Sequence, residues 1–89
     1  MMYPFMTLND NTEIVHSEMK PDGRVKVYIE RPVMRGFDSA ECWLPRYQWA
    51  NITGFSEKEI AYFQELLEST AHIIIELSQE GGLTNAANL

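Results

Sequence analysis

Few residues of this 89-residue chain have types and spacing that suit chemistry. Its two histidines, His16 and His72, lack the spacing of a metal site. The only cysteine, Cys42, cannot form an internal disulfide, and we expect a buried, inert thiol in a reducing compartment. No nucleophile elbow, glycine-rich phosphate loop or aspartate pair is present. The sequence therefore predicts a protein that is not an enzyme, with no cofactor and no metal.

The charge of the chain is negative and unevenly distributed. The formal net charge is −6, and residues 56–89 hold one Lys against six Glu, which leaves −5 in this part. Nucleic acids and anionic membranes are bound by Lys and Arg, so we expect neither as a partner. The apolar N-terminus is soon followed by acidic residues and fits neither a signal peptide nor a membrane span. These features predict a cytoplasmic protein.

Residues 24–31 alternate between polar and apolar types and predict a half-buried strand. Its apolar face consists of Val25, Val27 and Ile29. The preceding segment, residues 20–23, is Lys-Pro-Asp-Gly, which favours a tight turn with Gly23 at positive φ. The two features together predict a β-hairpin.

The hairpin register follows from the turn if Lys20 lies opposite Arg24. This register places Val15 on the inner, apolar face of the sheet. On the outer face it sets His16 opposite Tyr28, a ring pair of the kind that stabilises a sheet. We therefore expect His16 to be exposed on the outer face.

Three further segments have weaker strand signals. Residues 38–44 alternate and predict a third strand with an inner set formed by Ala40, Cys42 and Leu44. Residues 3–8 are a possible fourth strand, although a proline lies near the start. Residues 45–54 are interpreted as a connector with one helical turn.

A long helix is predicted from residue 57 to residue 80. Ser56 and Glu59 form a capping box at its start. Gly81 and Gly82 favour a left-handed C-cap at its end, and residues 83–89 are expected to be a frayed tail. The predicted fold is one α+β domain over residues 1–82: an antiparallel sheet of three to four strands with one long C-terminal helix packed on one face.

The helix has an apolar arc wider than one small sheet needs. The stripe expected to pack on the sheet is Ile60, Phe63, Leu67, Ala71 and Ile74. An additional edge consists of Tyr62, Leu66, Ile73 and Leu77. Because exposed apolar patches usually mark interfaces, this edge predicts a homodimer.

A second candidate interface is the outer sheet face, with Ile14, His16, Tyr28 and Trp43. Alternatively, these side chains only stabilise the sheet, or the N-terminal segment covers them. In its size, charge and Gly-Phe-Ser-Glu helix start, the chain resembles small acidic bacterial proteins, which implies an intracellular bacterial protein.

The function predicted is a non-catalytic protein–protein interaction module. Its partner is either a second copy or a basic heterologous protein, because the chain itself is acidic. An antitoxin-, immunity- or inhibitor-like protein is one subclass. The alternative is a small hydrolase or ligand-binding domain that uses His16, Tyr28, Trp43 and Glu41.

Overall fold

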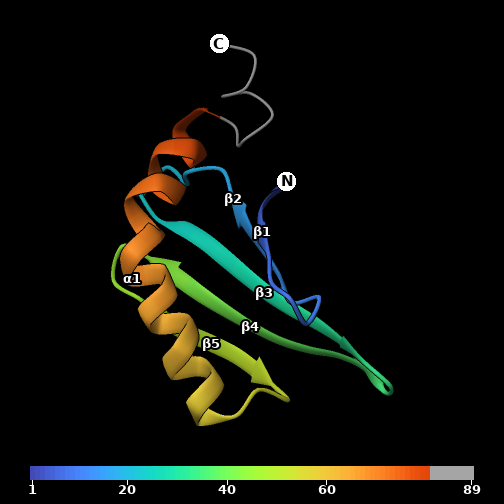
Figure 1. Cartoon of the computed structure of the whole chain (residues 1–89). Coiled ribbons are helices and arrows are strands. Elements are labelled where there is room, and N and C mark those ends of the chain that lie inside the picture. Colours follow the sequence, from blue (N-terminus) through green and yellow to red (C-terminus); the bar gives the residue numbers. More distant parts are fainter. Residues whose placement is uncertain (81–89) are drawn as a thin grey trace.

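The structure, a computed structural model, describes residues 1–80. A five-stranded antiparallel sheet has the strand order β1-β2-β3-β4-β5, and α1 lies across one of its faces (Figure 1). This is the α+β fold that was predicted, with five strands in place of three to four. The elements are β1 (Met2–Thr7), β2 (Glu13–Ser17), β3 (Val25–Val33), β4 (Gly36–Leu44), β5 (Gln48–Thr53) and α1 (Glu57–Glu80).

The strand in residues 3–8 is confirmed as β1. Its position at one edge of the sheet explains why Pro4 is tolerated, because an edge strand has one side without ladder hydrogen bonds. The expected connector in residues 45–54 was wrong, since it contains β5. Trp49 of β5 lies opposite Cys42, and its indole N–H donates to Gln64 Oε1 of α1 (2.8 Å). The register of β4 and β5 shifts within the pair, which interrupts the alternation of polar and apolar residues by which a strand is recognised in a sequence.

The core lies between the sheet and α1. All six inner residues predicted for β3 and β4 are fully buried: Val25, Val27, Ile29, Ala40, Cys42 and Leu44. The helix buries Phe63, Leu67, Ala71 and Ile74, and Ile60 packs partly buried beside them. The predicted helix stripe is therefore confirmed. Each large apolar side chain buried in this way contributes about 1.5–3 kcal/mol.

The β2–β3 turn closes as predicted, but the strands beyond it do not keep the predicted register. Lys20 N–H donates to the Arg24 carbonyl oxygen (2.8 Å), and Gly23 has a positive φ of 85°. Farther along, His16 lies opposite Val27. One additional residue is thus accommodated on the β2 side of the hairpin, between the turn and the regular ladder.

Two hydrogen bonds accompany this additional residue. The backbone N–H of Lys26 donates to the Ser17 hydroxyl oxygen (3.0 Å). The backbone N–H of Met19 donates to the Ser78 carbonyl oxygen near the end of α1 (3.1 Å) and not to the neighbouring strand. Because the side chains of a strand alternate between faces, a shift of one residue exchanges the two faces of β2.

The predicted outer positions of Ile14 and His16 were therefore wrong. Ile14 is 1 % exposed and His16 is 0 % exposed, and both lie on the inner face. The His16 ring lies 5.8 Å from that of Tyr3 and 6.5 Å from that of Phe5. Its Nδ1–H donates to the Ser17 carbonyl oxygen (2.8 Å), and Nε2 is buried without a hydrogen bond to any residue of 1–80. His16 is a core residue.

The start of α1 is held by the predicted capping box and by one arginine. Ser56 N–H donates to Glu59 Oε1 (2.9 Å), and Glu59 N–H donates to Ser56 Oγ (3.2 Å). Arg31 of β3 pairs with Glu59 and, through two N–H groups, with Asp38 Oδ2 (3.1 and 2.6 Å). Hydrogen bonds from Arg31 and from the Ser56 backbone hold the pKa of Glu59 below its usual value. The first turn of the helix is thereby tied to β3 and β4.

Three predictions lie outside the described residues. These are the stop at Gly81 and Gly82, the frayed tail over residues 83–89, and the domain end at residue 82. Within residues 1–80 no helix has both the length and the apolar character needed to cross a membrane.

The position of His16 can be tested by mutation. We expect His16→Ala to lower the free energy of unfolding by roughly 2–4 kcal/mol, because it leaves a cavity beside two aromatic rings. His72→Ala is the matched control: His72 is exposed on α1, and we expect a change within about 0.5 kcal/mol. Urea unfolding measures both values. Equal effects of the two substitutions would contradict the burial of His16.

Burial also raises the pKa of the Cys42 thiol to about 12 from an ordinary value of 9.0. Above pH 9 the unfolded chain loses this proton while the folded chain keeps it, so rising pH favours unfolding. We expect the free energy of unfolding to fall more steeply between pH 9 and pH 12 in the wild type than in Cys42→Ala. At pH 8 a thiol reagent should react with Cys42 only after denaturation. Rapid labelling of the native protein would place Cys42 outside the core.

Candidate functional site: the open face of the sheet

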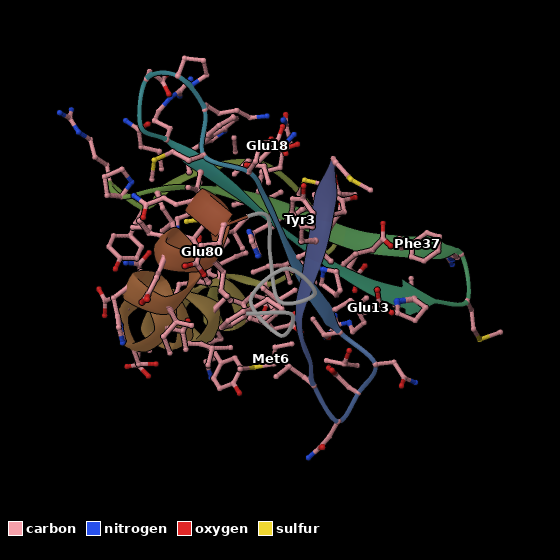
Figure 2. The ribbon with its side chains drawn as sticks, turned by 90° about the horizontal axis from the view of Figure 1, so that it is seen from above. Tyr3, Met6, Glu13, Glu18, Phe37 and Glu80 are labelled. Atoms are coloured by element: carbon pink, nitrogen blue, oxygen red, sulfur yellow. The ribbon has the colours of Figure 1, made fainter. Side chains whose placement is uncertain are left out.

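The side of β3 and β4 that faces away from α1 carries three aromatic side chains. Alternation along the strands places Tyr28 of β3 and Trp43 of β4 on this face. Phe37 lies on the same face of β4, opposite Pro32, where the β3–β4 hairpin projects beyond the helix (Figure 2). We call the surface formed by Tyr28, Phe37 and Trp43, with the polar residues between them, the open face.

Trp43 lies among cations at one end of the open face. The guanidinium of Arg24 stacks over its ring at 4.4 Å, and Lys26 Nζ is 5.9 Å from the ring centroid. Lys26 also pairs with Glu41 (3.2 Å). These contacts fix the orientation of the indole while leaving it partly exposed.

The middle of the open face is also internally paired. The hydroxyl of Tyr28 donates to Glu30 Oε2 (3.1 Å), and Arg24 pairs with Asp22 of the preceding turn (2.7 Å). Hydrogen bonds from Arg24 hold the pKa of Asp22 below its usual value. Most charges of the open face are therefore balanced locally.

Of the four residues predicted for the outer sheet face, the structure keeps two. Tyr28 and Trp43 lie there, whereas Ile14 and His16 lie on the opposite face. The sheet itself separates His16 from the two aromatic rings and from Glu41. The arrangement expected for a small hydrolase or ligand-binding domain, with His16 beside these residues, is therefore not formed.

Phe37 was not among the residues predicted for the outer sheet face. It is 58 % exposed, and the neighbouring Val33 and Met34 are 40 % and 105 % exposed. A signal was present, because the alternation of residues 38–44 continues to Gly36 at its N-terminal end. The glycine and the proline of this segment indicated a loop, but the strands extend to the last residues of the hairpin.

Of the four residues predicted to form an exposed edge on the helix, two are exposed and two are not. Tyr62 and Ile73 are exposed (54 % and 41 %), while Leu66 is partly buried against the core and Leu77 is only 7 % exposed. The expectation that Leu77 belongs to an exposed edge was wrong, because its side chain is buried. Tyr62 also lines a groove of about 430 Å³ beside the loop that follows β1, so this edge is flanked by the protein's own chain.

The solvent-facing side of α1 is acidic. Its exposed charged residues are Glu57, Lys58, Glu65, Glu68, Glu76 and Glu80. His72 is exposed on the same helix, and within residues 1–80 no group of three or more His, Cys, Asp or Glu side chains is placed to hold a metal ion. Since α1 lies on one side of the sheet (Figure 1), these acidic side chains are on the side of the molecule opposite the open face.

Comparison with known proteins gives no relative from which a function can be transferred. No family model matches the chain, and neither a curated protein nor a solved structure matches it.

Proposed function

We propose that the protein is a non-catalytic interaction module that binds another protein through the open face. The observation that supports this is a sheet face with three accessible aromatic side chains, Tyr28, Phe37 and Trp43, opposite the face that α1 covers. Tyr and Trp are enriched in protein interfaces because they combine large apolar area with a polar group. A cytoplasmic location belongs to the proposal and is supported by the free thiol of Cys42.

The partner we propose is a second copy of the chain. The charges of the open face are largely paired within each copy, Lys26 with Glu41 and Arg24 with Asp22, so two such faces can approach without strong repulsion. Packed sheets lie about 10 Å apart, which leaves the two acidic helices on the outer sides of the assembly. Their separation then exceeds the Debye length of about 8 Å at physiological salt. A twofold axis closes such a dimer.

The helix edge is a weaker candidate for self-association. It offers only Tyr62 and Ile73 as exposed large apolar side chains, and two helices in contact would bring their acidic sides together. A basic heterologous protein is a second candidate partner, favoured by the exposed acidic side of α1. That surface stays free in a dimer formed through the open face, so the two proposals are compatible.

Sedimentation equilibrium over micromolar concentrations tests the proposed dimer. We expect Tyr28→Ser with Phe37→Ser to weaken association at least about tenfold, because each loses apolar area from the interface. The matched control is Tyr62→Ser with Ile73→Ser, which removes two exposed apolar side chains from the helix edge and should leave association unchanged. Added salt should strengthen the wild-type dimer, since each chain carries a net charge of −6.

Two results would contradict the proposal. One is a wild-type protein that stays monomeric at the highest concentration in high salt. The other is dissociation caused by the helix-edge pair but not by the open-face pair. Circular dichroism of each variant distinguishes lost association from lost folding.

A further inference from the structure

A groove of about 310 Å³ opens at the end of the sheet, where the β2–β3 and β4–β5 turns meet. Its walls include Asp22 and Arg24 from the first turn, Arg46 and Gln48 from the second, and Trp43 with Pro45 between them. This volume is at the lower end of the range of small-molecule sites, about 300–1,000 Å³.

The two arginines of the groove are held differently. Arg24 Nε donates to Asp22 Oδ2 (2.7 Å), and Asp22 Oδ1 accepts the backbone N–H of Arg24 (3.0 Å). These two hydrogen bonds and the stacking on Trp43 fix the Arg24 guanidinium. The terminal N–H groups of Arg24 make no hydrogen bond within residues 1–80. Arg46 forms no ion pair with any residue that the structure describes. Donors on both sides of the groove are thus free to bind an anion.

We propose that this groove binds a small monocarboxylate that carries a flat apolar group. Arg24 and Arg46 against Asp22 leave one net positive charge, which matches a single carboxylate. A guanidinium can bind the two oxygens of a carboxylate through parallel N–H groups. The carboxylate of Asp22 disfavours a dianion such as phosphate, because like charges would then lie together.

The apolar part of the ligand is specified by Trp43 and Pro45. The indole of Trp43, on which Arg24 is stacked, and the ring of Pro45 both line the groove, and a flat apolar group can pack against them. Gln48 also lines the groove and carries a polar amide. This inference goes beyond the proposed protein binding. Trp43 belongs both to the open face and to the groove, but the residue substituted in its test, Arg46, lines only the groove and is unchanged in the dimerisation test.

Phenylacetate, with uncharged phenylacetamide as its matched control, probes the site in the full-length protein. The readout is the indole N–H signal of Trp43 in ¹H–¹⁵N spectra. Trp49 serves as an internal control, because its indole N–H is bonded to Gln64 on the other side of the sheet. We expect phenylacetate to shift the Trp43 signal in a saturable way, the amide to leave it unchanged, and Trp49 to respond to neither.

Two variants test the assigned role of Arg46. We expect Arg46→Gln to raise the Kd of phenylacetate at least about tenfold, and Lys58→Gln, which removes a cation from exposed helix surface, to leave it unchanged. Arg46→Lys keeps the charge and should give an intermediate Kd. Equal binding of phenylacetamide, or no saturable shift up to about 20 mM phenylacetate, would overturn the proposal.

Discussion

The structure depends on how the β2–β3 hairpin accommodates one additional residue between Ser17 and the turn. The Ser17 hydroxyl accepts the backbone N–H of Lys26, while Met19 donates its own N–H to Ser78 of α1. The irregular backbone therefore loses few hydrogen bonds, and the hairpin is joined to the end of the helix. Because a shift of one residue exchanges the faces of a strand, this feature decides which side chains of β2 enter the core.

The helix is consequently attached to the sheet at both ends. Near its N-terminus Arg31 joins Glu59 to Asp38, and near its C-terminus Ser78 accepts the N–H of Met19. Between these points the apolar stripe of α1 packs on one face of the sheet, and no helix of residues 1–80 covers the other face (Figure 1). Because α1 lies on one face, the aromatic side chains of the other face stay accessible, and the acidic side chains on the far side of α1 point away from the sheet. The proposed association through the open face follows from this placement.

Features that depend on local alternation and capping could be predicted from the sequence. The inner sets of β3 and β4, the helix stripe and the Ser56–Glu59 capping box are all confirmed. The faces of β2 could not be predicted, because they depend on a hydroxyl acceptor and on a contact with a helix about 60 residues away in sequence. Of the candidate site, Tyr28 and Trp43 followed from alternation. The groove beside Trp43 could not, since its walls come from two turns that meet only in the folded chain.

The face assignment of β2 is tested most directly by nuclear Overhauser effects of the His16 ring in the native protein. The structure places this ring 5.8 Å from the Tyr3 ring and 6.5 Å from the Phe5 ring, centroid to centroid. Cross-peaks from His16 ring protons to those of Tyr3 and Phe5, with none to the Tyr28 ring, are expected. Cross-peaks between His16 and Tyr28 would contradict the register and would return His16 to the open face.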